Sequence, residues 1–170
     1  MKGNNYAFID SQNLNLGIQD LGWRLDYRKF RIYLKEKYGV QTAYLFIGFI
    51  MENQNLYRSL QKYGYILMFK PVLKTADGRV KGNVDADLVL RAMIDYQEYD
   101  QAIIVTSDGD FYCLVEYLYA QKKLKIVMSP NREKCSILLT KTAKERIIFL
   151  HNLRGKLAYK NEKAPQQDKT

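Results

Sequence analysis

Short apolar runs alternate with helical patterns along almost the whole sequence, and few folds accommodate such an order. Strands are expected at residues 6–9, 42–50, 65–69, 102–106 and 124–128, with a sixth allowed at 146–150. Helices are expected at residues 25–38, 53–63, 84–96, 110–121 and 136–142. The strands are apolar on both faces, which is typical of a parallel sheet covered by helices on both sides. The pattern therefore predicts a doubly wound α/β fold.

Local signals refine the predicted boundaries. Asp26 is placed to cap the start of the first expected helix, and Gly39 is placed to end it. The polar stretch KTADGRVKGN, residues 74–83, contains an Asp-Gly turn signal and predicts an exposed loop or hairpin. The 170 residues fit one domain, which we expect at residues 1–153. Residues 154–170 are basic and polar, and we expect a disordered tail there.

Composition excludes several classes of protein. No apolar run approaches the roughly 18 residues that a membrane span needs, so no membrane association is expected. The N-terminal stretch does not have the pattern of a signal peptide. Cys113 and Cys135 lack metal-ligand spacing and are interpreted as two reduced thiols of a cytoplasmic protein, although the sequence leaves a disulfide open. His151 is the single histidine, which argues against a zinc site and favours oxygen ligands for Mg²⁺ or Mn²⁺.

The positive charge is concentrated at one end of the chain. Residues 1–120 hold 14 Lys and Arg against 14 Asp and Glu, so the whole net charge of +9 falls in residues 121–170. A neutral body with a basic end indicates a polyanionic partner, most simply nucleic acid; the alternative is a solvated, charged tail. The candidate phosphate contacts are Lys122, Lys123, Arg132 and Lys134 in this basic part, with Arg79 and Lys81 in the polar loop. Any exposed tyrosine among the 14 could stack on a base, but the sequence singles out none.

Acidic residues follow the buried strands. Asp10 ends the first strand, Asp108 follows the fourth, and Asp110 stands one residue beyond Gly109. In the strand order 3-2-1-4-5, strands one and four are neighbours at the switch point, where such folds place their sites. Asp85 and Asp87 begin a helix that can face the same edge.

Carboxylates gathered in this way repel one another unless a cation lies between them, because nearby like charges raise each pKa. Mg²⁺ prefers carboxylate oxygens, and a metal held by them can activate water for attack on a phosphodiester.

Each of these residues also has an ordinary structural interpretation. Asp108 or Asp110 could cap the next helix, Asp85 and Asp87 could be first-turn acids, and Asn13 could be a turn residue. Other chemistries of α/β proteins lack their motifs. The sequence contains no GxGxxG, no GxxxxGK[ST] and no GxSxG, and Asp10 is followed by Ser-Gln rather than by a second aspartate two positions on.

Three segments, taken together, resemble a known family. YAFIDSQNL, KGNVDADLVL and IIVTSDGDFYCLVEYL are similar to the NYN domain, a branch of the PIN-like nuclease superfamily, over roughly residues 4–150. The resemblance implies a Rossmann-like α/β/α sandwich with a metal-dependent ribonuclease centre. It implies metal-binding and catalytic roles for Asp10, Asp85, Asp108 and Asp110, with Asn13 and Ser107 in support. Asp87 is added as a candidate ligand because it begins the same helix.

One position departs from the family pattern. Members often carry an acid six positions after the residue that matches Asp85, and this chain has Arg91 there. Arg91 lies one helical turn from both Asp87 and Asp95, so a surface ion pair is one interpretation. The other is that Arg91 replaces a metal-site acid and contacts a phosphate.

The sequence therefore predicts a Mg²⁺- or Mn²⁺-dependent endoribonuclease, with RNA favoured over DNA. The alternative is a weak or inactive nuclease-like module that binds RNA or a protein partner, and a phosphatase is a third, weaker option. The resemblance also allows a homodimer.

Overall fold

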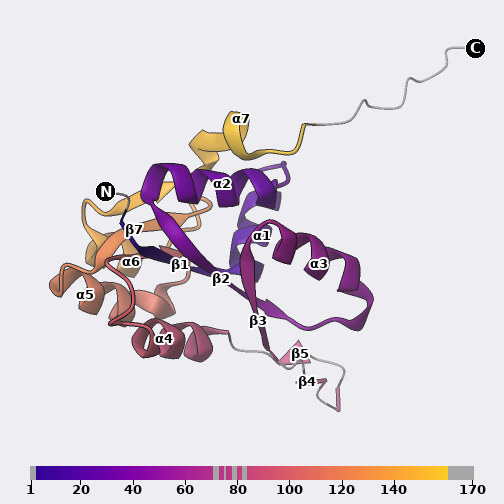
Figure 1. Ribbon diagram of the computed structural model, residues 1–170, viewed down its shortest axis with the longest axis horizontal. Coiled ribbons are helices and arrows are strands. Elements are labelled where there is room, and N and C mark those ends of the chain that lie inside the picture. The colour runs from indigo at the N-terminus through magenta and orange to yellow at the C-terminus, as the bar shows by residue number, and fades with distance from the viewer. Residues whose placement is uncertain (1–2, 71–72, 75, 78–79, 82–83, 161–170) are drawn as a thin grey trace, which may run out of the picture.

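The computed structural model describes residues 3–70, 73–74, 76–77, 80–81 and 84–160. Its main feature is a sheet of six parallel strands in the order β3-β2-β1-β6-β7-β8. Figure 1 labels β3, β2, β1 and β7 of this sheet. The strands are β1 (Asn5–Asp10), β2 (Val40–Gly48), β3 (Tyr65–Lys70), β6 (Ala102–Val105), β7 (Leu124–Ser129) and β8 (Ile147–Phe149). The predicted parallel sheet and its strand order are confirmed, including the sixth strand.

Helices cover both faces of this sheet, as the sequence predicts. The α-helices are α1 (Ser11–Gln19), α2 (Tyr27–Tyr38), α3 (Gln54–Lys62), α4 (Asp85–Ile94), α5 (Tyr112–Ala120), α6 (Ile137–Ala143) and α7 (Arg154–Leu157). The described residues also form the short 3-10 turns η1 (Met51–Asn53), η2 (Gly109–Phe111) and η3 (Leu150–Leu153). None of the helices in the described part of the chain is long and apolar enough to cross a membrane.

Two apolar cores lie on opposite faces of the sheet. The first core packs α1, α2, α3 and α7 against strand residues such as Ala7 and Ile9. The second core packs α4, α5 and α6 against the opposite side, including Phe8. Successive side chains of β1 therefore enter different cores, because side chains alternate across a strand. Apolar strands buried on both faces produce this α/β/α sandwich.

The helix boundaries follow the predicted capping residues. The Asp26 side chain accepts hydrogen bonds from the backbone N–H groups of Arg28 and Lys29 at 3.0 and 3.2 Å, and so caps α2. Gly39 follows α2 with φ of 65°, a left-handed conformation that glycine adopts readily. Both predicted caps are confirmed.

Two segments add elements that the sequence left open or missed. The polar stretch after β3 contains an antiparallel pair, β4 (Leu73–Lys74) and β5 (Val80–Lys81), so the hairpin alternative is the one that forms. Helix α1 was not predicted from the sequence. It begins directly after Asp10 and buries Leu14 and Ile18 in the first core, one helical turn apart.

The expected C-terminal boundary also requires a correction. We expected a tail from residue 154, but residues 154–157 form α7, and Leu157 is buried in the first core. Ala158 makes an isolated antiparallel bridge with Leu25. The packed fold therefore continues past residue 153, and residues 161–170 lie outside the described ranges.

Candidate metal centre

The sheet brings the ends of β1 and β6 together, as the predicted strand order requires. Ile9 pairs with Val105 in the parallel ladder, so Asp10 and Thr106 leave the sheet side by side. Asp10 is buried, and its carboxylate accepts a hydrogen bond from the Thr106 hydroxyl at 3.2 Å. The Thr106 oxygen in turn accepts from the backbone N–H of Asp108 at 3.1 Å. One threonine thus connects the acid of β1 with the acid that follows β6.

A second set of hydrogen bonds fixes α1 against the loop that follows β6. The Asn13 side-chain oxygen accepts from the backbone N–H of Ser107 at 2.8 Å and from its hydroxyl at 2.9 Å. Asp10 also caps α1 by accepting from the backbone N–H of Asn13 at 3.4 Å, a long contact. Asn13 and Ser107 therefore hold the loop in place, and Asn13 lies in a helix rather than a turn.

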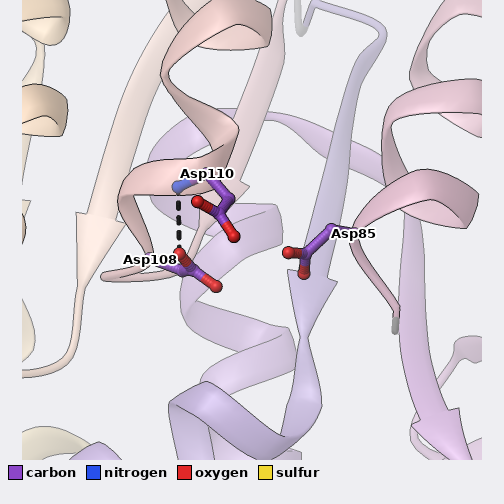
Figure 2. Close-up of side chains that lie close together, drawn as sticks. All are labelled: Asp85, Asp108 and Asp110. Carbon is purple, nitrogen blue, oxygen red and sulfur yellow. Dashed lines mark hydrogen bonds between the residues drawn. The ribbon is translucent and has the colours of Figure 1, made fainter. Parts of the chain in front are cut away.

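Three carboxylates from two separate segments converge beyond these strand ends. Asp85 begins α4, Asp108 precedes η2, and Asp110 lies within η2. Each offers an oxygen atom, and these oxygens lie within 4.8 Å of one another. Figure 2 shows Asp85 facing Asp108 and Asp110 from the opposite side of the gap. Asp108 also accepts from the backbone N–H of Asp110 at 2.9 Å, so its capping role and its place in this acidic trio coexist.

The electrostatics of these acids reflect burial and mutual repulsion. Burial raises the pKa of Asp10 to about 6, and the charges of Asp85 and Asp108 add to the rise, although hydrogen bonds from Asn13 and Thr106 oppose it. Burial also raises the pKa of Asp85, with further contributions from Asp108 and Asp110, while Lys70 lowers it. The negative charges are thus held at a cost in free energy that a bound cation would offset.

A hollow of about 270 Å³ opens over these residues. It is lined by Asp10, Gln12, Asn13, Leu16, Val84, Asp85 and Asp108. A larger hollow of about 380 Å³ lies at the opposite edge of the sheet and is lined by residues that include Lys35, Lys37 and Lys125. We assign the chemistry to the smaller hollow, because the acidic trio adjoins it. Among the described residues, this trio is the group of carboxylates close enough to share an ion.

Two predicted site residues of α4 lie outside the trio. Asp87 is exposed and has no place in the group of converging oxygens. Arg91 forms an ion pair with Asp95 at 3.3 Å, and its guanidinium lies 5.7 Å from the centre of the Tyr44 ring. Of the two interpretations of Arg91, the structure shows the ion pair, made along the helix and away from Asp85.

The predicted phosphate contacts are divided between the two edges of the sheet. Lys122 and Lys123 immediately precede β7, at the edge opposite the trio, and Lys123 packs over Tyr96 and Tyr99. The structure therefore does not bring these two lysines to the acids. The reason is that Lys122 and Lys123 lie at the start of a strand, which is the amino-end edge of a parallel sheet, whereas the acids lie at the carboxyl-end edge.

Other basic candidates lie on the acidic side or outside the described residues. Arg132 and Lys134 follow the end of β7; Arg132 lies over the Phe149 ring at 4.5 Å, and Lys134 pairs with Asp20 at 2.5 Å. Arg79 and the Lys81 side chain lie outside the described residues. Lys70, which no sequence motif singled out, ends β3 close enough to Asp85 to lower its pKa. Thr106 was also missed as a site residue, although its position before Ser107 and Asp108 was a signal for it.

Gly109 separates the two acids of the loop because no larger residue fits there. A Cβ atom at this position would lie 2.3 Å from Ser136 Oγ and 2.9 Å from Ser136 Cβ. Ser136 is itself fixed, since its hydroxyl caps α6 and its backbone N–H donates to Ser107 O at 3.1 Å. The glycine therefore allows η2 to pack directly against the start of α6.

Gly109→Ala should lower the free energy of unfolding by about 1–3 kcal/mol, the usual cost of overpacking. Urea unfolding would measure this change. Gly155→Ala is the matched control, because nothing lies within 4 Å of a Cβ there and alanine is the better helix former in α7. Equal stability of the two variants would contradict the steric argument.

A comparison with known protein families identifies the family of this chain. A family model described as NYN domain matches residues 6–151. This chain belongs to the NYN domain family. The match spans the six strands and every acid of the site, so the predicted resemblance is confirmed. Membership indicates a PIN-like nuclease fold, and NYN domains generally act on RNA with divalent metals.

Individual relatives agree with this assignment. The NYN domain chain is 26% identical over 158 residues to low amplitude and bright protein LabA of Synechococcus elongatus, covering 87% of this chain and 84% of that protein. A crystal structure of VPA0982, a protein of unknown function from Vibrio parahaemolyticus, superposes with a TM-score of 0.73 at 24% identity. It covers 88% of this chain and 93% of its own. At this identity, the structural likeness supports the fold alone.

Proposed function

We propose that this NYN domain protein is a divalent-metal-dependent endoribonuclease. The observation that carries the proposal is the convergence of Asp85, Asp108 and Asp110, whose oxygens lie within 4.8 Å of one another although they come from two distant segments. Asp10 lies next to them, because the Thr106 hydroxyl hydrogen-bonds to both the Asp10 carboxylate and the backbone N–H of Asp108.

The donor set fits the proposed metal. All of the converging ligand atoms are carboxylate oxygens, which suit Mg²⁺ and Mn²⁺ better than softer metals. Burial and then the charges of Asp108 and Asp110 raise the pKa of Asp85, and a cation among these carboxylates would oppose that repulsion. Asp85, Asp108 and Asp110 would hold the ion directly, with Asp10 beside them and Asp87 still a candidate.

When bound, such an ion would activate a water molecule and stabilise charge on the phosphodiester oxygens. The protein's own residues position the site. Asn13 and Ser107 fix the loop that carries Asp108, and Thr106 orients the Asp10 carboxylate. Asp10 lines the same hollow but is not one of the three converging acids, so it is the candidate to accept a proton from the attacking water. The Lys70 ammonium group, close to Asp85, is placed to contact a phosphate oxygen.

A cleavage assay tests the proposal. Purified protein is incubated with end-labelled single-stranded RNA, with Mg²⁺ or Mn²⁺ and with or without a chelator. We expect internal cuts that require the metal and stop when the chelator is added. Cleavage that continues in excess chelator would contradict the metal role, and release of single terminal nucleotides would contradict endonucleolytic cutting. Labelled DNA and a small phosphate ester, run in parallel, test RNA preference and the phosphatase option.

A second candidate function is binding without catalysis. It is favoured by Arg91, which occupies a position where related proteins often have an acid and which the structure pairs with Asp95. The module would then hold RNA or a protein partner through the same hollow. Metal-dependent cleavage by the wild-type protein would exclude this candidate, whereas RNA binding without any cleavage would support it.

The remaining expectations concern assembly and compartment. The homodimer stays a prediction; Leu90, Met93 and Ile94 are exposed on α4 and form the surface that a second copy would bury. A monomer mass in sedimentation at every concentration would contradict it. The cytoplasm also stays a prediction, and the two free thiols of Cys113 and Cys135 are in keeping with a reducing compartment. Fractionation of cells that express the protein would test this assignment.

A further inference from the structure

Two phenylalanine rings are exposed at the carboxyl ends of β2 and β3. Phe49 is 41% exposed and Phe69 is 42% exposed, whereas Tyr57 of α3, which touches both rings, is 4% exposed. The ring centres of Phe49 and Phe69 lie 5.5 Å apart, at an interplanar angle of 89°. The ring centre of Tyr57 lies 6.0 Å from that of Phe49 and 4.8 Å from that of Phe69. The buried tyrosine thus supports a pair of rings that solvent can reach.

The backbone around Phe49 is fixed from two sides. Its N–H donates to the carbonyl oxygen of Lys70 at 3.2 Å. The Tyr57 hydroxyl accepts from the N–H of Ile50 at 2.8 Å and donates to the carbonyl oxygen of Gly48 at 3.0 Å. Because the backbone that carries the Phe49 ring is already fixed, little conformational entropy is lost there when the ring binds a partner.

These rings lie on the same edge of the sheet as the acidic trio. Asp10 pairs with Phe46 in the ladder, and Phe46 pairs with Met68. Phe49 is three residues beyond Phe46, so it stands roughly 10 Å past the level of Asp10, at about 3.3 Å per residue. Lys70 follows Phe69 directly and is the last residue of β3. A basic residue therefore follows the aromatic pair at the edge of the sheet where the acids lie.

We propose that Phe49 and Phe69 form a stacking subsite for an unpaired nucleobase of an RNA strand whose backbone crosses Lys70 to reach the acids. This inference rests on the proposed function and specifies its substrate as single-stranded RNA. An aromatic ring can stack on any base, because every base has a π face, so the subsite is tolerant of sequence. Bases inside a duplex are already stacked and paired, so they cannot reach the rings without being unpaired.

Binding should be measured by fluorescence anisotropy with a short, labelled, unstructured oligoribonucleotide, in an Asp108→Asn background that keeps the strand intact. Phe49→Ala and Phe69→Ala should each weaken binding by about 5- to 150-fold, the range for loss of one stacked base. Phe49→Tyr should retain near wild-type affinity and a near wild-type melting temperature, which separates stacking from folding.

Two control variants and two control strands complete the experiment. Met51→Ala removes an apolar side chain that is 72% exposed beside Phe49 but has no ring, and Tyr117→Ala removes an aromatic ring that is 43% exposed on α5. Each control should change affinity by less than about two-fold, because neither removes a stacked base. A fully paired duplex of the same sequence should bind the Asp108→Asn protein more weakly than the single strand does. An abasic strand should also bind more weakly, and Phe49→Ala should then cause no additional loss.

Unchanged affinity of the Phe49 and Phe69 variants would overturn the proposal. An equal loss with the abasic strand would also overturn it, because the rings would then act on the backbone. A change of oligomeric mass with unchanged RNA affinity would assign the rings to a protein contact instead. If the wild-type protein fails to cut RNA but this binding pattern holds, the proposed hydrolysis fails and the subsite stands. If cleavage occurs but ring removal has no effect on binding, the subsite alone fails.

Discussion

Asp108→Asn should reduce metal-dependent RNA cleavage by at least about 100-fold, because loss even of groups that only orient metal ligands costs about 10- to 100-fold. Asp108 is central among the acids: it belongs to the trio and its charge acts on both Asp10 and Asp85. Asparagine has nearly the same shape, and its side-chain oxygen can still accept from the N–H of Asp110. The substitution therefore removes a negative charge and leaves the loop intact. Initial rates at saturating RNA, with Mg²⁺ varied, measure the loss.

Two further variants make this result specific. Glu116→Gln removes an exposed carboxylate of α5, which is not one of the converging acids, and should leave the rate unchanged. Asp87→Asn tests a ligand that the sequence suggested and that the converging oxygens do not include. A loss as large as that of Asp108→Asn would restore Asp87 to the metal set. Full cleavage by Asp108→Asn, at wild-type Mg²⁺ dependence, would remove the basis of the proposed function.

The architecture and the acidic edge could both be predicted because they depend on local patterns and one topological rule. Strands that are apolar on both faces imply a covered parallel sheet, and the ends of β1 and β6 must then meet at the switch point. Asp108 or Asp110 was also expected to have a competing role as a helix cap, a role that was not expected of Asp10. The structure shows that the two roles coexist, since Asp10 caps α1 and Asp108 caps η2 while both face the site.

The features that escaped prediction depend on tertiary contacts. Helix α1 is polar, with only Leu14 and Ile18 buried among apolar residues, and its Gly17 is a poor helix former. A Cβ at Gly17 would lie 2.6 Å from the Pro130 ring, so this glycine serves a close approach to the loop after β7. That contact joins segments far apart in the sequence and has no local signal.

The positions of the basic and aromatic residues on the fold could not be read from the sequence for a different reason. Charge density along the chain shows that residues 121–170 are basic but does not show which edge of the sheet each lysine occupies. Lys122 and Lys123 come just before a strand, and Arg132 and Lys134 come just after it, so connectivity alone separates them. The exposed rings of Phe49 and Phe69 were hidden in apolar runs, because an apolar pattern does not reveal where burial ends.

Asp10→Asn should make the metal-free protein more stable while impairing cleavage. Burial, with some repulsion from Asp85 and Asp108, raises the pKa of Asp10 from 3.8 to about 6. Between these values the folded protein binds more protons at this site than the unfolded chain, so stability falls as the pH rises through the window. Above about pH 6 the full penalty applies, up to about 3 kcal/mol, because each tenfold change in the acid dissociation constant corresponds to about 1.4 kcal/mol. An uncharged amide avoids this penalty and can still bond to Asn13 N and Thr106 Oγ1.

Urea unfolding of both proteins in chelator, from about pH 3.5 to 8, measures this difference across the pKa window. The two proteins should be about equally stable below pH 3.8, where the Asp10 carboxyl is protonated in both states, and should diverge up to about pH 6. Added Mg²⁺ should reduce the advantage of the variant, because loss of the Asp10 charge beside the trio weakens binding of the ion, and an ion that binds folded wild type more tightly stabilises wild type more by mass action. Glu116→Gln should stay within about 0.5 kcal/mol of wild type at every pH. A variant that is less stable than wild type at neutral pH without metal would show that Asp10 contributes more through its hydrogen bonds than its buried charge costs. The acids would then be structural caps, and the argument for a cation among them would lose its energetic basis.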